Sequence, residues 1–384
     1  MRPMPAPLGL YIHIPFCKSK CVYCDFYSLP RSESRMDDYT DALCAHLAET
    51  APFAAGHLVD TVYFGGGTPT SLSPAQMKAV LAGLHSSFYI APGAEISVET
   101  SATELTQEML EVLAEGGVNR LSVGIQTFDD SARRLLGRRG SGEFAASRVA
   151  AAISAGIRNT SIDLIYNYPG QTDELLLKDL DTIISLDAAG ISFYSLMLHE
   201  KTPLYKRLDE SAKKRMQDIG RERELFDIIL NRLTPAGYRM LELTKLVKDG
   251  RDRYDYMEIR HSGGSCIALG HGAGGNIENY FYHNTHTCGD VSQDIHICSR
   301  GRVLSDRYRV LDALIYALQK GSADLAPFSG RLGTDLVQLF KEKLSIFANC
   351  GYLTVRGSTV ALTRDGVFFG NNIISELINT LAGS

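Results

Sequence analysis

The chain has 384 residues, of which 45% are hydrophobic and 22% are charged, a composition typical of globular domains. This length allows a main domain and one or two smaller ones. The formal net charge of −5 and the lack of a Lys/Arg-rich stripe argue against a nucleic-acid partner. No stretch suggests a signal peptide or a membrane span, so the sequence predicts a cytoplasmic protein.

The first predicted strand, residues 10–14, leads into a loop that carries three cysteines. Pro15 ends the strand, and Cys17, Cys21 and Cys24 follow at C-x3-C-x2-C spacing. In a reducing compartment, such a group indicates metal binding rather than disulfides. A four-iron cluster is normally held by four cysteines, so three thiolates would leave one iron open to a small molecule. A zinc site that lacks its fourth ligand stays an alternative.

The cysteine motif resembles that of the radical S-adenosylmethionine (SAM) superfamily, which has an aromatic residue, here Tyr23, before the last cysteine. The surrounding sequence is similar to the branch that holds oxygen-independent coproporphyrinogen III oxidases, the haem chaperone HemW and enzymes of anaerobic haem utilisation. The resemblance implies that Cys17, Cys21 and Cys24 are the catalytic metal ligands of a [4Fe-4S] cluster. The open iron would bind SAM, and an electron from the cluster would cleave it to a 5′-deoxyadenosyl radical.

Up to about residue 200, short apolar runs alternate with amphipathic helical stretches. This alternation predicts an α/β fold with right-handed crossovers and a parallel sheet. The resemblance implies a partial (βα)6 TIM-like radical SAM barrel over residues 1–205, with functional residues at the carboxyl ends of its strands. The predicted strands are residues 10–14, 59–64, 94–98, 120–125, 161–165 and 191–196, and the predicted helices include 75–88, 106–115 and 143–155.

Three glycines, Gly65, Gly66 and Gly67, follow the second predicted strand, with Thr68 and Pro69 after them. Glycines let the backbone approach a ligand closely and leave its N–H and C=O groups free to bond it. A plain tight turn is the alternative interpretation. The segment resembles the family motif that holds the methionine amino group of SAM, so these residues are predicted to bind the cofactor.

Polar residues also end the next three strands, as Glu99, Gln126 and Asp163. They match family residues that contact SAM. The amide of Gln126 offers both a donor and an acceptor, and the carboxylate of Asp163 suits ribose hydroxyls. Arg138 matches an arginine that pairs with the SAM carboxylate, a bidentate role for which Arg is better suited than Lys. The alternatives are a solvated carboxylate for Glu99 and a surface salt bridge for Arg138.

Tyr11 matches a family position close to the SAM sulfonium, although a core aromatic on a strand is nearly as good an interpretation. Asn167 and Tyr168 depart from the commonest form of the family pattern after the fifth strand. Because Asn tolerates the left-handed backbone conformation better than most residues, we expect the turn there to survive.

Residues 206–300 lose the alternation and are predicted to form an extension that faces the substrate. Residues 213–233 predict one long helix, and Gly270 to Gly275 resemble the second glycine-rich element of the family. This extension is rich in histidine. His261, His271 and His283 are predicted substrate residues, because neutral imidazole binds haem iron or another metal. For each of them a surface or satisfied core histidine is the alternative; His286, Cys288 and His296 belong to the same group.

The last predicted unit, residues 301–384, resembles a winged helix. It has a helix at 334–349, a hairpin at 352–362 and a second helix at 364–380. With no basic recognition helix, we interpret it as a structural or substrate-covering module and not as a DNA reader.

Differences between this sequence and the family motifs distinguish among the functions known in the family. Phe26 stands where coproporphyrinogen III oxidases of this type carry another cysteine, so that activity is not expected. The haem-chaperone motif His-Asn-x-x-Tyr-Trp ends in a Trp, and this chain has none, which argues against a chaperone. Residues 251–254 look similar to the corresponding stretch of enzymes of anaerobic haem utilisation. We therefore predict a radical SAM enzyme that methylates and opens haem or a related tetrapyrrole, with a flavodoxin- or ferredoxin-type reductant. A HemW-like chaperone that binds and transfers haem stays an alternative, as does a radical SAM methylase of a non-tetrapyrrole substrate.

Overall fold

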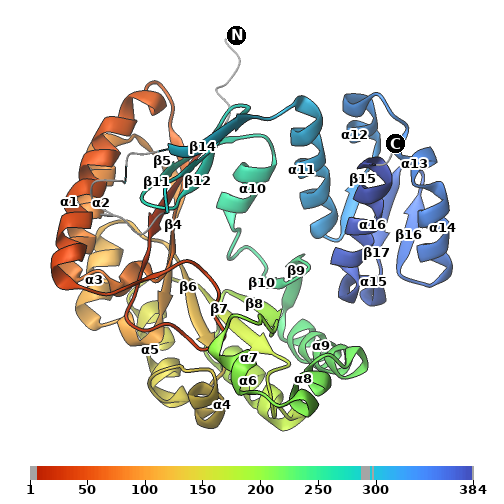
Figure 1. Ribbon diagram of the computed structural model, residues 1–384, viewed down its shortest axis with the longest axis horizontal. Helices are drawn as coiled ribbons and strands as arrows, with labels where there is room; N and C mark the ends of the chain where they lie inside the picture. The colour runs from red at the N-terminus through yellow and green to blue at the C-terminus, as the bar shows by residue number, and fades with distance from the viewer. Residues whose placement is uncertain (1–6, 287–294, 296–297, 383–384) are drawn as a thin grey trace.

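The structure is a computed structural model, and it describes residues 7–286, 295 and 298–382. Its centre is a sheet with the strand order β14-β13-β12-β11-β1-β4-β5-β6-β7-β8-β10-β9 (Figure 1). The strands from β1 to β8 in this order are parallel neighbours. They are β1 (Leu8–Ile14), β4 (Val59–Gly66), β5 (Ile90–Ser101), β6 (Arg120–Gln126), β7 (Asn159–Tyr166) and β8 (Gly190–Ser195). All six predicted strands, and the α/β partial barrel, are confirmed.

Helices connect these strands and lie on the outside of the sheet (Figure 1). The predicted helices at 75–88, 106–115 and 143–155 are present within one or two residues at either end. The helices of this part are α1 (Glu33–Thr50), α2 (Pro74–Ser87), α3 (Gln107–Glu115), α4 (Asp130–Leu135), α5 (Gly142–Ser154) and α6 (Asp173–Ser185).

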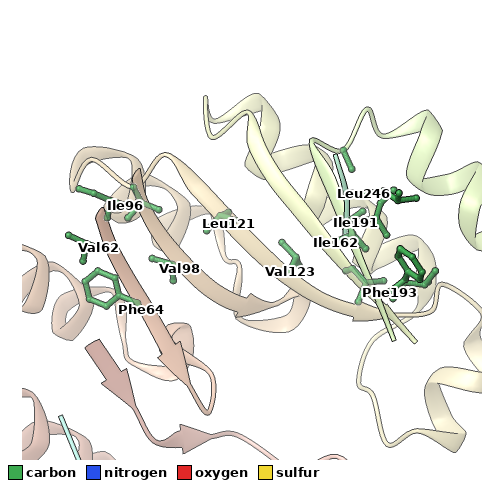
Figure 2. Close-up of a cluster of buried hydrophobic side chains, with 14 of the residues drawn as sticks. Val62, Phe64, Ile96, Val98, Leu121, Val123, Ile162, Ile191, Phe193 and Leu246 are labelled. Atoms are coloured by element: carbon green, nitrogen blue, oxygen red, sulfur yellow. The ribbon is translucent and has the colours of Figure 1, made fainter. Parts of the chain in front are cut away.

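The two faces of the parallel sheet differ in chemistry because successive side chains on a strand point to opposite sides. The outer face is apolar and packs under the helices; Figure 2 shows it with Val62, Phe64, Ile96, Val98, Leu121, Val123, Ile162, Ile191, Phe193 and Leu246. The inner face carries the residues between these: Thr61, Tyr63, Glu95, Ser97, Glu99, Arg120, Ser122, Ser161, Asp163 and Ser192. Since parallel sheets are usually apolar on both faces, this polar interior indicates a binding function.

Residues 206–300 extend the same sheet at both ends. At one end β11 (Ser265–Leu269) pairs parallel with β1, and β12 (Gly274–Ile277), β13 (Tyr280–Asn284) and β14 (Cys298–Val303) continue it antiparallel. At the other end β10 (Lys245–Lys248) and β9 (Tyr238–Glu242) follow β8. The division of the chain at residues 205 and 300 stays a prediction.

The single helix predicted for residues 213–233 is wrong. The chain forms α7 (Pro203–Arg207), α8 (Glu210–Met216) and α9 (Ile219–Leu233). The break comes at Asp218, whose carboxylate accepts hydrogen bonds from the N–H groups of Gly220 and Arg221 and so begins a new helix.

The C-terminal part has the predicted order of helix, hairpin and helix, but both helices are divided, after Leu339 and after Phe368. The comparison with a winged helix stays a prediction. Among the described residues, no helix is both long enough and apolar enough to cross a membrane. The elements are α11 (Asp306–Gln319), β15 (Ser322–Asp324), α12 (Ala326–Leu332), α13 (Leu336–Leu339), α14 (Lys341–Asn349), β16 (Leu353–Arg356), β17 (Thr359–Leu362), α15 (Arg364–Phe368) and α16 (Gly370–Ala382).

A buried ionic cluster lies near the amino-terminal ends of the inner strands. The connection between β10 and α10 (Asp255–His261) inserts Asp252, which is 0% exposed. Its carboxylate lies 2.6 Å from Nε of Arg120 and 2.7 Å from Nζ of Lys245. Burial alone would raise the pKa of Asp252, but the two cations lower it well below its ordinary value.

Replacing Asp252 should therefore be costly. We expect Asp252→Ala to lower the free energy of unfolding by about 3–5 kcal/mol, because it removes the carboxylate that two buried cations share and leaves Arg120 with Glu95, at 4.0 Å. Asp249→Ala is the matched control, since Asp249 lies on the same connection, is 86% exposed and, among the described residues, forms an ion pair with Arg239 alone; its cost should stay below about 1 kcal/mol. Urea unfolding measures both, and equal costs would contradict the role given to the cluster.

Candidate cofactor site

The three cysteines lie on a loop that is closed at its base. β2 (Phe16–Cys17) pairs with β3 (Leu29–Pro30), and the N–H of Leu29 donates to the carbonyl of Pro15 at 2.7 Å. Cys17, Cys21 and Cys24 are free and half-buried. Within the loop the N–H of Cys24 donates to the carbonyl of Cys21 at 3.2 Å, which keeps these two residues close.

The thiols are surrounded by polar groups from other elements. Sγ of Cys17 lies 3.7 Å from the hydroxyl of Thr68, and a guanidinium N–H of Arg138 reaches Sγ of Cys21 at 3.3 Å. Burial raises the pKa of the Cys17 and Cys24 thiols, so a bound metal would be needed to hold them as thiolates at neutral pH.

The donor set fits a cluster of several irons. The other described cysteines, Cys44, Cys266, Cys298 and Cys350, belong to other elements, so the loop offers three thiols. Among the residues that the structure describes, no three His, Cys, Asp or Glu side chains are gathered closely enough for a single metal ion. A four-iron cluster on this loop would have one iron without a cysteine.

The three glycines at the end of β4 lie against the start of the cysteine loop. A Cβ atom on Gly67 would fall 2.6 Å from the carbonyl oxygen of Phe16, and one on Gly66 would fall 2.8 Å from the ring of His13. Gly66 also has a φ of +116°, which favours glycine. No larger residue would allow this approach.

The expectation that the backbone N–H groups here are free is wrong. Gly66 N–H points to Glu99 at 3.3 Å, Gly67 N–H donates to Ile14 at 2.9 Å, and Thr68 N–H donates to Phe16 at 2.8 Å. The N–H groups of Gly67 and Thr68 therefore tie the segment after β4 to the end of β1 and the start of the cysteine loop. With these N–H groups occupied, the backbone of this segment could contact a ligand through its acceptors, which suit the N–H groups of an amine.

Glu99 lies on the inner face at the end of β5. Its carboxylate accepts a 2.7 Å hydrogen bond from the Tyr63 hydroxyl. Burial raises the pKa of Glu99 to about 7, and the nearby charge of Asp163 adds to the increase. Without a cation beside it, this carboxyl group is about half protonated at neutral pH.

Gln126, Arg138 and Asp163 converge on the same rim. Gln126 has a φ of +72° at an irregularity in the pairing of β6 with β7, a strained conformation for a non-glycine residue. Arg138 donates to the Gly124 carbonyl, and its Nε is buried without a hydrogen-bond partner. Asp163 accepts a 3.1 Å hydrogen bond from Ser122, and burial raises its pKa.

Tyr11 also faces the interior, where its hydroxyl lies 2.9 Å from Nδ1 of His13. Its ring stacks on those of Tyr63 and Tyr256, at centroid distances of 6.2 and 5.9 Å. The sequence analysis missed Tyr63 and Tyr256; the inward parity of Tyr63 with Gly65 on β4 was a signal for the first. The left-handed turn at Asn167, with a φ of +59°, is present as expected.

The three predicted substrate histidines are not brought together. His261 lies on α10, 2.9 Å from Asp312, and stacks on Tyr316. His271 is 0% exposed, and its Nδ1 is 3.0 Å from the Tyr27 hydroxyl. His283 lies on β13 and is partly exposed. Cys288 and His296 lie outside the described residues.

Comparisons with known proteins agree with this arrangement. Residues 11–183 match the family model described as the radical SAM superfamily. The chain is 30% identical to the haem chaperone HemW of Bacillus subtilis over 97% of this chain and 99% of that protein. It belongs to the radical SAM superfamily. It is also 27% identical to an anaerobilin synthase of Escherichia coli, over 96% of this chain and 83% of that protein.

The similarity to a solved structure of a radical SAM enzyme extends through almost the whole chain. The coproporphyrinogen III oxidase HemN of Escherichia coli superposes with a TM-score of 0.84 at 25% identity, over 97% of this chain and 90% of that one. Radical SAM proteins use a [4Fe-4S] cluster and SAM. The three-thiol loop, the glycine segment and the polar rim beside it fit these two groups.

We expect SAM to bind more tightly as the pH rises through about 7. The carboxylate of Glu99 attracts a cation and the neutral acid does not, so binding releases a proton. Affinity should rise about five- to tenfold between about pH 6 and 7.5, a range in which the sulfonium charge of SAM does not change. His13 does not interfere, because burial and the charge of His271 lower its pKa to about 4.

Equilibrium dialysis on the anaerobic, cluster-loaded protein measures this dependence. Glu99→Gln is the control, which should bind SAM more weakly and with a flat pH profile. An equal pH dependence in the variant and the wild type would assign the titration to another group, such as Asp163, whose charge acts on Glu99.

Proposed function

We propose that Cys17, Cys21 and Cys24 hold the [4Fe-4S] cluster and that the rim beside them holds SAM. When reduced, the cluster supplies the electron that cleaves SAM and yields a carbon radical. The chain's own residues would bind and orient the cofactor: backbone carbonyls and Glu99 the amino group, and Arg138 the carboxylate. The proposed SAM residues are Tyr11, Gly65, Gly66, Gly67, Thr68, Glu99, Gln126, Arg138 and Asp163.

We propose further that the substrate is haem or a related tetrapyrrole, which the protein methylates and opens in the cytoplasm under anaerobic conditions. The observation that carries this proposal is the pair of full-length similarities, to a haem chaperone and to an anaerobilin synthase. The inner face supports a catalytic role, since its polar groups are buried and held in fixed positions away from bulk water.

Local features favour an enzyme other than coproporphyrinogen III oxidase. Phe26, which takes the place of a further cysteine, has no metal-binding atom and is 73% exposed. The full-length similarity to HemW supports a second candidate, a haem chaperone. Against it, His261, from the region of the chaperone motif, is committed to Asp312 on α11. A radical methylase of another substrate is the third candidate.

We expect the anaerobic, reconstituted protein to consume haem when SAM and a strong reductant are added. The Soret band should disappear, and mass spectrometry should find a methylated or linear tetrapyrrole. Cys21→Ala should cleave no SAM, whereas Cys350→Ala, which alters an exposed thiol of the C-terminal module, should behave like the wild type.

Other outcomes of this experiment would select another candidate. A shifted but persistent Soret band, with haem recovered intact, would support the chaperone. An unchanged spectrum would remove haem and leave a methylase of another substrate. SAM cleavage by Cys21→Ala would contradict the cluster assignment itself.

We propose that a small acidic electron carrier of the flavodoxin or ferredoxin type reduces the cluster at a basic surface on α7 and α8. Both helices lie beside the cysteine loop: the Leu204 N–H donates to the Val22 carbonyl at 2.9 Å, and Val22 and Tyr23 pack against the apolar cluster that contains Met216.

The exposed cations of this surface make no ion pair among the described residues. They are Lys206, Arg207, Lys214 and Arg215. Such a patch would steer an acidic carrier, and salt would weaken the attraction. The rate at which the carrier reduces the cluster should fall as the ionic strength rises, whereas the rate with dithionite should not. An equal salt dependence of the two rates would contradict the proposal.

A further inference from the structure

One face of the strands β12 to β14 carries an imidazole, an aromatic ring and guanidinium groups. In the pairing of β13 with β14, His283 lies opposite Arg300, and Phe281 lies opposite Arg302. Side chains directly opposite one another on antiparallel strands share a face, with their Cβ atoms about 4.5–5.5 Å apart. We call these residues, together with Arg260 at the end of α10, the His283 face.

The His283 ring rests on bare backbone. Gly274 lies opposite His283 on β12, and a Cβ atom there would fall 2.4 Å from Cε1 of the ring. The edge of the imidazole meets Phe281, with ring centroids 5.0 Å apart and planes at 72°. Neither ring nitrogen has a hydrogen-bond partner within the part of the chain that the structure describes. The ring is thus held in place while its nitrogen atoms stay available to a ligand.

His283 is also in the right protonation state to bind iron. Burial lowers the pKa of His283, and the charges of Arg300, Arg260 and His286 lower it further. The imidazole is therefore neutral at pH 7, which is the form that ligates metals. Of these charges, Arg300 lies directly opposite His283 on β14.

Among the residues that the structure describes, the cations of this face have no anionic partner. Over residues 7–286 and 298–382, none of Arg260, Arg300 and Arg302 forms an ion pair; Arg260 donates to the Tyr256 hydroxyl, and Arg302 lies over the rings of Phe281 and Tyr308. In a chain with a formal net charge of −5, three such groups around one imidazole favour an anionic ligand. Guanidinium is the group best suited to carboxylates.

The His283 face adjoins the cysteine loop. Tyr27 lies in that loop, after the third cysteine. Its ring approaches Gly272, in the turn just before β12, so closely that a Cβ atom on Gly272 would fall 3.5 Å from it. Its ring also meets that of His286, which follows β13, at a centroid distance of 5.9 Å. A ligand on this face would therefore lie beside the segment that carries the three thiols.

We propose that the His283 face binds haem, with His283 as an axial iron ligand and Arg260 and Arg300 as partners of the two propionate carboxylates. Phe281 provides apolar contact for the macrocycle. The inference rests on the proposed function and adds the residues that recognise the substrate. Of the three histidines predicted to contact the substrate, it selects His283, because His261 pairs with Asp312 and His271 is fully buried.

Anaerobic titrations with three probes test this assignment: haem, metal-free protoporphyrin, and the dimethyl ester of protoporphyrin. His283→Ala should weaken haem binding about tenfold or more and shift the Soret band, yet leave the affinity for metal-free protoporphyrin within about twofold. Arg300→Gln should weaken haem and metal-free protoporphyrin alike, about tenfold, and leave the ester unaffected. His57→Ala and Arg239→Gln, which change residues on other elements, are the matched controls.

The outcomes distinguish this inference from the proposed function. If the wild type binds no haem, the proposed function fails. If the wild type binds haem and His283→Ala has the same spectrum and affinity, or if His261→Ala or His286→Ala removes the axial ligand instead, the assignment of His283 is overturned. A loss of all three probes from a variant that unfolds at the same urea concentration as the wild type would also contradict iron ligation.

Discussion

The close approach of Gly67 to the backbone of Phe16 is the contact on which the cofactor site depends. It joins the glycine segment after β4 to the first residues of the cysteine loop, and any Cβ atom at Gly67 would collide with the Phe16 carbonyl oxygen at 2.6 Å. Hydrogen bonds from Gly67 and Thr68 to Ile14 and Phe16 hold the two segments together. The proposed cluster ligands and the proposed SAM residues therefore lie on one connected edge of the barrel.

The interior of the barrel extends this edge into a polar surface, at a cost that the chain offsets by pairing its charges. Arg120 and Lys245 are buried against Asp252 below the rim. Higher up, Glu99 and Asp163 form no ion pair with any residue that the structure describes, and burial raises the pKa of both. Buried carboxyl groups of this kind mark functional sites more often than structural ones. The charges are balanced where the barrel is only structural and left unbalanced where a cationic cofactor would bind.

Much of this was predictable from the sequence, because the information is local. The apolar runs predicted all six parallel strands, and the carboxyl-end rule placed Glu99, Gln126 and Asp163 on one rim. The edge strands β9 to β14 could not be read in the same way, since their pairing depends on contacts far apart in the chain. The break at Asp218 was missed because a capping carboxylate inside an amphipathic pattern resembles a surface residue. Composition alone could not distinguish the three histidines, which differ only in their tertiary partners.

The central claim is that three cysteines leave one iron open at the rim where SAM binds. Electron paramagnetic resonance of the reduced cluster, recorded before and after SAM is added, tests it most directly. The account predicts that SAM changes the g values of the wild-type cluster. A fully loaded cluster whose spectrum does not respond to bound SAM would contradict it, because the cofactor would then lie away from the open iron.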